Sequence, residues 1–218
     1  MGNDLKINKK LERYISDHSH DLHPVQKELI SYNKSLGKIK RMQISLSQAY
    51  FFQFLIKSFE LKKILEVGTF TGYSALSMGL SLNKDGNIIC LDKNEKTSAI
   101  AKNFFKKAKL DKKIKIINGQ AETLLKKFLK ENKKFDMIFI DADKENYKSY
   151  YNLSVDLINT KGFILIDNVL WHGDVVDPNK NDTLTVKIRE FNSLIKKDNR
   201  VEKIILPLGD GLTICRKV

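Results

Sequence analysis

The stretch Phe135-Asp136-Met137-Ile138-Phe139-Ile140 runs directly into Asp141-Ala142-Asp143-Lys144, and a second apolar stretch, Gly162-Phe163-Ile164-Leu165-Ile166, runs into Asp167-Asn168. Short runs of β-branched and aromatic residues with polar boundaries predict fully buried strands, and the segment between these two is long enough for a crossover helix. We therefore expect two parallel, neighbouring strands. Their carboxyl ends would lie side by side, about 5 Å apart, at the edge where open α/β sheets bind ligands.

The acidic residues at these two strand ends predict a cation site. Two carboxylates at that separation repel each other by about 3 kcal/mol at an effective dielectric constant of about 20, so either one carries a proton or a cation lies between them. Oxygen ligands from Asp141, Asp167 and Asn168 suit a hard divalent ion, Mg²⁺ first, with Mn²⁺ and Ca²⁺ as alternatives. The other interpretation of Asp167-Asn168 is a turn or a helix cap.

The composition is that of one basic α/β domain spanning residues 1–218, with 42% hydrophobic residues to build its core. The net charge of +13 invites a nucleic-acid interpretation. However, the 39 basic residues are 34 lysines and 5 arginines, spread along the chain. Surfaces that bind phosphates and bases favour arginine forks and aromatic platforms. The sequence therefore favours a solvated lysine-rich surface, and we do not expect a nucleic-acid partner.

Cellular location is predicted from the hydrophobic pattern and the cysteines. No run reaches the roughly 18 to 20 apolar residues of a membrane span, and residues 1–6 lack the apolar stretch of a signal peptide. Cys90 and Cys215 both lie inside apolar strand-like runs, where a free thiol behaves as a small hydrophobe. We expect a cytoplasmic protein without a membrane partner and without a disulfide framework.

The remaining pattern predicts a doubly wound sheet behind a helical extension. Residues 1–60 favour helices, and within them residues 46–59 carry a dense apolar face that Ser47 is placed to cap. From Lys63 onward strand and helix signals alternate, which predicts helices on both faces of the sheet. Only residues 207–211 separate the last two strands, so these two should form an antiparallel hairpin. The predicted strands are residues 64–67, 87–91, 114–117, 135–140, 162–166, 201–206 and 212–215.

A glycine loop follows the first predicted strand: Glu66-Val67-Gly68-Thr69-Phe70-Thr71-Gly72-Tyr73-Ser74. Gly68 and Gly72 allow a tight turn and a close approach to a ligand, but the spacing is not the G-x-G-x-x-G of dinucleotide sites. A small ligand without a pyrophosphate fits better. Asp92, at the end of the second strand, is placed to accept hydrogen bonds from ribose hydroxyls. Without Asp92 and the acidic strand ends, the loop would be equally compatible with a plain βα turn.

Together, four motifs resemble those of the cation-dependent O-methyltransferases, the family that includes caffeoyl-CoA and catechol O-methyltransferases and many bacterial members. The resemblance extends from about Met42 to the C-terminus, and we expect a bacterial member. It implies a Rossmann-like S-adenosylmethionine (SAM)-dependent methyltransferase fold, with a seven-stranded, mostly parallel sheet whose last strand is antiparallel. The four motifs are Leu65 to Ser74, Asp141 to Lys144 with Asn146-Tyr147, Asp167 to Trp171, and Gly209-Asp210-Gly211.

The resemblance also implies a role for individual residues. Asp141, Asp167 and Asn168 correspond to the family's metal ligands, and Lys144 corresponds to the proposed catalytic base. The catalytic residues would thus be Lys144 and Asp141. The implied SAM-binding residues surround the methionine part (Glu66, Gly68, Thr69, Ser74), the ribose (Asp92) and the adenine (Gln120, Ala121), with further cofactor contacts from Ile44, Asp141 and Asp143.

The activity that follows from this resemblance is divalent-cation-dependent transfer of a methyl group from SAM to a hydroxyl of a catechol-type small molecule. A homodimer is expected as well, with the apolar N-terminal helices as a plausible surface. Two alternatives remain open at this point. One is a SAM-dependent RNA methyltransferase, motivated by the charge of +13; the other is a non-catalytic module that binds SAM or a metal.

Overall fold

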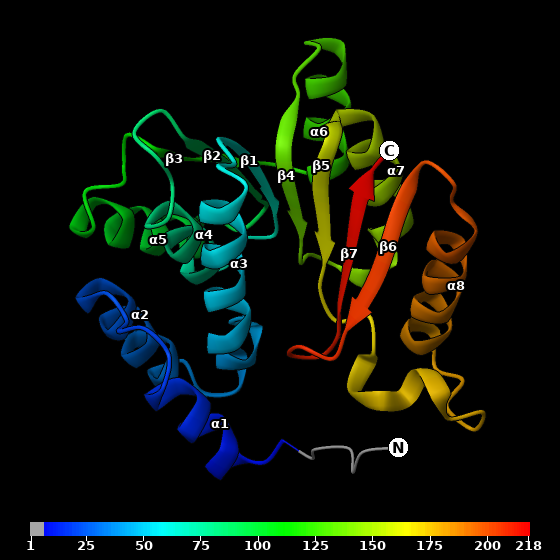
Figure 1. The fold of residues 1–218 in the computed structure, drawn as a ribbon, viewed down its shortest axis with the longest axis horizontal. Coiled ribbons are helices and arrows are strands. Elements are labelled where there is room, and N and C mark those ends of the chain that lie inside the picture. The colour runs from blue at the N-terminus through cyan, green and yellow to red at the C-terminus, as the bar shows by residue number, and fades with distance from the viewer. Residues whose placement is uncertain (1–6) are drawn as a thin grey trace.

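The computed structural model describes residues 7–218 and contains a seven-stranded sheet with helices on both faces (Figure 1). The strand order is β3-β2-β1-β4-β5-β7-β6. All neighbouring pairs from β3 to β5 are parallel, and β7 runs antiparallel to both β5 and β6. The strands are β1 (Lys63–Val67), β2 (Asn87–Asp92), β3 (Ile114–Asn118), β4 (Phe135–Ile140), β5 (Ile158–Ile166), β6 (Val201–Leu206) and β7 (Leu212–Lys217). The predicted doubly wound fold and the C-terminal hairpin are thus confirmed.

The helices divide into an N-terminal group before β1 and a set of crossovers between the strands. The N-terminal group confirms the predicted helical extension from residue 9 onward, and residues 1–6, where no signal peptide was expected, lie outside the described part. Figure 1 shows α1 to α3 gathered beside α4 and α5, and α8 at the opposite end of the sheet. The helices are α1 (Lys9–Asp17), α2 (Pro24–Ser35), η1 (Gly37–Met42), α3 (Leu46–Ser58), α4 (Tyr73–Gly79), α5 (Glu95–Lys107), α6 (Ala121–Lys130), η2 (Lys144–Asn146), α7 (Tyr147–Leu157), η3 (Trp171–Val176) and α8 (Thr183–Lys197).

Two hydrophobic cores form because strand side chains alternate between the faces of the sheet. In β4, Met137 and Phe139 pack with α2 to α5, whereas Ile138 and Ile140 pack with α6 to α8. The first core joins the N-terminal extension to the sheet: Phe52 of α3 is fully buried and its ring meets that of Phe139 edge-on, with centroids 4.8 Å apart. The extension is therefore an integral part of the domain.

The chain order of the strands fixes where ligands bind. β2 and β3 lie on one side of β1, whereas β4 and β5 lie on the other. The helices that follow β1 and β4 consequently lie on opposite faces of the sheet, α4 in the first core and α7 in the second, which opens a crevice at the carboxyl ends of the strands. The predicted motifs after β1, β4 and β5 all open onto this edge.

Two further observations concern the expectations from composition. Cys90 and Cys215 are buried free thiols, as predicted. Within residues 7–218 no helix combines the length and the apolar character that crossing a bilayer requires.

Candidate active site

Gly68 brings the loop after β1 into contact with the loop after β4. Its φ of +92° lies in a region that favours glycine, and a Cβ added there would come within 2.1 Å of the carbonyl oxygen of Asp141. The Gly68 amide donates to the carbonyl of Leu91 (2.9 Å), and the Asp141 amide donates to that of Val67 (2.9 Å). The two loops are therefore fixed against each other at the point where the crevice opens.

Asp92 holds the glycine loop from the end of β2. Its Oδ2 accepts hydrogen bonds from the amides of Thr69 (2.9 Å) and Phe70 (2.8 Å), and its Oδ1 accepts one from the amide of Asn94 (2.8 Å). A carboxylate has about four lone-pair sites, so Oδ1 keeps capacity for another donor. Asp92 thus holds the glycine loop in place, and its predicted contact with a ribose would come in addition.

Glu66 lies under this loop rather than on its surface. Its side chain is fully buried, Oε1 accepts a hydrogen bond from the Ser74 hydroxyl (2.5 Å), and Oε2 has no partner among the described residues. Burial raises the pKa of Glu66 to about 7. An acid with an unused oxygen in such a place is energetically costly, and the arrangement suits a ligand that brings a positive charge.

The two acidic strand ends lie next to each other, as the sequence suggested. The residues that precede them, Ile140 and Ile166, are paired in the β4–β5 register, and the Asp167 amide donates to the carbonyl of Ile140 (3.1 Å). Burial and then the nearby Asp141 carboxylate raise the pKa of Asp167. The two carboxylates that the sequence predicted to repel each other therefore follow neighbouring strands at one edge of the sheet.

Two further side chains complete the acidic pair. Lys144 donates to Asp141 Oδ1 (2.8 Å), and both side chains are largely buried, with 13% and 18% exposed. Gln48, from α3, donates to Asp167 Oδ1 (2.7 Å). The hydrogen bond from Lys144 partly neutralises the Asp141 carboxylate, and the hydrogen bond from Gln48 holds the Asp167 side chain in one rotamer.

The chemistry of this set fits a divalent cation. Among residues 7–218 no group of three His, Cys, Asp or Glu residues is arranged to hold a metal, so a cation here would use the two carboxylates together with the Asn168 amide oxygen. Asn168 has a φ of +58°, a left-handed conformation that asparagine tolerates better than most residues. Hard oxygen donors of this kind are what Mg²⁺, Mn²⁺ and Ca²⁺ prefer.

A single cavity of about 840 Å³ gathers nearly all the predicted site residues. Its size is within the usual range of about 300–1,000 Å³ for small-molecule sites. Of the predicted residues, Glu66 does not line it, because that side chain is covered by Ser74. The predicted residues that line the cavity are Ile44, Gly68, Thr69, Ser74, Asp92, Gln120, Ala121, Asp141, Asp143, Lys144, Asp167 and Asn168.

Sequence reasoning gave no individual role to several polar residues at this cavity, and three of them make contacts that shape it. Gln48 lines it while holding Asp167, and Tyr150 lines it while donating from its hydroxyl to Asp143 Oδ1 (3.0 Å). Asp210 accepts from the His172 amide (2.6 Å) and so ties the hairpin to the segment after Asn168. Two of these had a signal in the sequence: Gln48 stands three residues after Ser45, the spacing of a capping box, and Asp210 belongs to the Gly209-Asp210-Gly211 motif.

Comparison with known proteins places the chain in a family. The O-methyltransferase family matches residues 16–218. A probable caffeoyl-CoA O-methyltransferase of Dictyostelium discoideum is 37% identical over 217 residues, which cover 98% of this chain and 94% of the relative. An O-methyltransferase from Bacillus cereus, solved in complex with SAH, superposes with a TM-score of 0.87 at 29% identity, covering 96% of this chain and 97% of the other. An SAH-bound methyltransferase from Podospora anserina superposes with a TM-score of 0.89 at 28% identity over 100% of both chains.

These relatives come from an amoeba, a bacterium and a fungus, so the expectation of a bacterial member stays a prediction. The predicted family and fold are confirmed by the match and by the superpositions. Since the match spans residues 16–218 of a 218-residue chain, the chain belongs to the O-methyltransferase family and is a SAM-dependent O-methyltransferase related to the caffeoyl-CoA enzymes.

Proposed function

We propose that this protein transfers the methyl group of SAM to one hydroxyl of a catechol-type phenol, with a divalent cation, Mg²⁺ first, held by Asp141, Asp167 and Asn168. The observation that carries the proposal is the pair of carboxylates after β4 and β5, which follow residues paired in the strand register; burial, and then the Asp141 charge, raise the pKa of Asp167. A buried acidic pair of this kind is stable when a cation compensates it. The amide of Asn168 supplies the third oxygen.

The cavity of about 840 Å³ would take cofactor and acceptor side by side. Gly68, Thr69 and Ser74 line the part next to β1, where the methionine part of SAM would lie. Asp92 would hold the ribose, and Gln120-Ala121 would border the adenine. Trp171 and Asn168 line the part next to β5, which is left for the acceptor. Glu66 would act from beneath Ser74, through the charge it presents to the cofactor's ammonium group.

The chain's own residues then prepare the acceptor. A phenol has a pKa near 10, and a bound cation supplies Lewis-acid stabilisation of the ionised oxygen and a fixed position for it. Lys144, 2.8 Å from Asp141, donates to that carboxylate as an ammonium; a cation bound at Asp141 would disfavour this charged form, and Lys144, once it has released a proton to solvent, would accept the one from the acceptor hydroxyl. Fixing the oxygen in line with the sulfonium methyl contributes as well, since well-oriented reactants gain up to roughly 7 to 11 kcal/mol.

The cation dependence is tested by turnover with and without metal. The protein is incubated with SAM and caffeic acid, caffeoyl-CoA or a simple catechol, first with Mg²⁺ and then with EDTA. Asp167→Ala should abolish metal-dependent methylation and leave SAM binding largely intact, whereas Asp156→Ala, which removes an exposed carboxylate of α7, should change neither. Equal methylation in Mg²⁺ and EDTA, or full activity of Asp167→Ala, would contradict the cation role.

The role of Lys144 is tested separately. Lys144→Met should lower turnover by about 10²- to 10⁴-fold, the usual contribution of a general base. It should also remove one limb of the pH–rate profile, which a merely structural role would leave in place. The matched control is Lys148→Met, an exposed lysine four residues further on. Unchanged turnover of Lys144→Met would exclude it as the base.

The homodimer, the cytoplasmic location and the absence of a nucleic-acid partner stay predictions. Large apolar side chains on the N-terminal helices support self-association, because Tyr14 and Phe54 are 58% and 72% exposed. Light scattering checks the dimer: a mass of twice 25.1 kDa is expected. A mass of 25.1 kDa at micromolar concentration would contradict it.

A further inference from the structure

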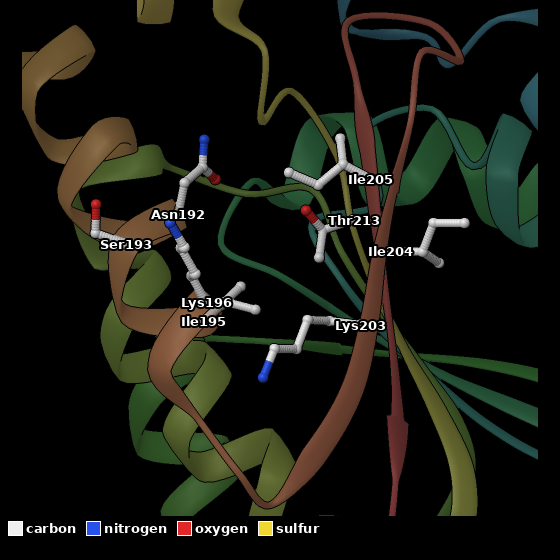
Figure 2. A pocket seen from close by; sticks show the side chains of 8 residues that line it. All are labelled: Asn192, Ser193, Ile195, Lys196, Lys203, Ile204, Ile205 and Thr213. Carbon is white, nitrogen blue, oxygen red and sulfur yellow. The ribbon is translucent and has the colours of Figure 1, made fainter.

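A second cavity lies between α8 and the β6–β7 hairpin and shares no lining residue with the active-site cavity. Its volume is about 320 Å³, at the lower end of small-molecule sites. Figure 2 shows the side chains of Ile195 and Ile205 on opposite sides of this space. The lining residues are Asn192, Ser193, Ile195, Lys196, Lys203, Ile204, Ile205 and Thr213.

Two buried oxygens in the wall of this cavity have no hydrogen-bond partner within the described chain. They are Oγ1 of Thr213, a residue that is 2% exposed, and Oδ1 of Asn192. The orientation of the Asn192 amide is fixed, because its Nδ2 donates to the carbonyl of Val169 (2.8 Å). Its oxygen is therefore held as a buried acceptor without a donor, and Figure 2 shows it pointing from α8 toward Thr213.

Two lysines stand among the lining residues. Lys203 donates to the carbonyl of Asp198 (2.7 Å) and keeps two further donors. Lys196 is exposed and makes no ion pair within residues 7–218. The cavity thus offers an apolar middle, a hydroxyl and an amide oxygen in its wall, and positive charge from α8 and β6.

We propose that this cavity binds a small hydroxyaryl carboxylate, with one ring, one hydroxyl and one acid group. The ring would lie between Ile195 and Ile205. A single hydroxyl satisfies both unpartnered oxygens, because it donates to Asn192 Oδ1 and accepts from the Thr213 hydroxyl. The acid group would then reach Lys196 and Lys203, whose ammonium groups match an anion at the cavity mouth.

The hydroxyl contact is tested with 4-hydroxybenzoate as the probe, by calorimetric titration in the presence of saturating SAH. Thr213→Val keeps the shape of the side chain and removes its hydroxyl, so affinity should fall about three- to tenfold. Thr213→Ser is the matched control and should retain binding. Benzoate, which lacks the hydroxyl, should bind wild type and Thr213→Val equally. An equal loss for both ligands would show that the substitution acts through packing and would overturn the hydroxyl assignment.

The charge contact has its own pair of variants. Lys196→Gln should weaken 4-hydroxybenzoate by about threefold and leave its methyl ester unaffected, whereas Lys197→Gln, an exposed neighbour outside the cavity, should weaken neither. Methyl NMR shifts of Ile195 and Ile205 locate the ligand. Binding that survives Thr213→Val and Lys196→Gln but is lost in Asp167→Ala would place the probe in the active site. Either that result or the absence of binding at millimolar concentrations of 4-hydroxybenzoate would overturn the proposal.

Discussion

Replacing Glu66 by glutamine should remove part of the pH dependence of the free energy of unfolding. Glu66 is fully buried, with one carboxylate oxygen bonded to Ser74 and the other without a partner in the described chain. Glutamine has nearly the same shape, still accepts the Ser74 hydrogen bond and carries no charge at any pH. The substitution therefore isolates the energetic consequence of ionising this group inside the core.

The size of the effect follows from the pKa. Burial raises the pKa of Glu66 from an ordinary 4.5 to about 7, so the folded protein holds this proton more tightly than the unfolded chain. The stabilisation from that proton is fully present below pH 4.5 and is lost as the pH rises through 7. At 1.36 kcal/mol for each pH unit, the loss is about 3 kcal/mol. Glu66→Gln removes this loss; its unpartnered amide adds a cost of about 1–3 kcal/mol that does not vary with pH.

Urea unfolding from pH 4.5 to pH 8.5 measures the difference. The free energy of unfolding of Glu66→Gln minus that of wild type should rise by about 3 kcal/mol over this range, and most of the rise should fall between pH 5 and 7. The exposed Glu190→Gln is the control and should give a flat difference. A flat difference for Glu66→Gln as well would show that Glu66 is not perturbed by burial and would refute the reasoning.

The same variant tests the proposed contact between Glu66 and the cofactor. If the SAM ammonium group needs the ionised carboxylate, the affinity of wild type for SAM should fall about tenfold for each pH unit below 7. Glu66→Gln should bind SAM more weakly at pH 8 and with little dependence on pH. Calorimetric titration gives both numbers. A wild-type affinity for SAM that stays constant between pH 5.5 and 7 would show that the Glu66 carboxylate does not interact with the cofactor.

Two further substitutions test the packing of α3 against the sheet and the contact between the loops after β1 and β4. Phe52→Ala should cost about 3–5 kcal/mol of unfolding free energy because it empties a fully buried position against Phe139, whereas Lys57→Ala, at an exposed position on the same helix, should stay within about 0.5 kcal/mol. Equal costs in urea unfolding would contradict the packing of α3. Gly68→Ala should cost at least about 1–3 kcal/mol and weaken SAM binding, because its φ is +92° and its Cβ would meet the Asp141 carbonyl. Unaltered stability and SAM affinity would show that the two loops are not in contact.

The fold was predictable where the hydrophobic period was unambiguous. The strand ending at Ile140 and the C-terminal hairpin lie where their apolar runs placed them. The start of β5 was wrong: the strand begins at Ile158, four residues earlier than predicted. Residues 159–161 are polar and partly or fully exposed, so they carry no burial signal; they lie in an irregularity of β5, between Ile158, which pairs with Phe135, and Phe163, which pairs with Met137.

The cap of α3 was also placed wrongly. Ser47 was expected to cap it, but the helix is capped by Ser45, whose hydroxyl accepts from the Gln48 amide (3.2 Å) while the Gln48 side chain accepts from the Ser45 amide (2.9 Å). This Ser-x-x-Gln pattern is readable from the sequence as a capping box. The contact of the same Gln48 with Asp167, 119 residues further on, is not, because only the tertiary fold brings α3 to the end of β5.

Glu66 lies deeper than the other predicted cofactor-binding residues of its motif. The motif predicts a cofactor contact there, yet the side chain lies beneath Ser74 and outside the cavity surface. Strand alternation explains this, because Leu65 and Val67 face the core of α6 to α8 and Glu66 must therefore point to the opposite face, toward α4. A motif assigns residues to a site, whereas the two-residue period of the strand decides which of them reach its surface.

The charge around the active-site cavity is opposite to that of the chain. Within a protein of net charge +13, five aspartates line this cavity against one arginine and two lysines, and Glu66 lies just beneath it. A cavity of this sign attracts cations and repels phosphates. SAM carries a sulfonium and an ammonium group, and a divalent metal is a cation, so both suit the site. An RNA substrate would bring a phosphate with every nucleotide to a cavity of negative sign, whereas the phosphates of a CoA thioester lie at the opposite end of the molecule from its phenol ring; this argues for the small phenolic acceptor. The five aspartates are Asp92, Asp141, Asp143, Asp167 and Asp210.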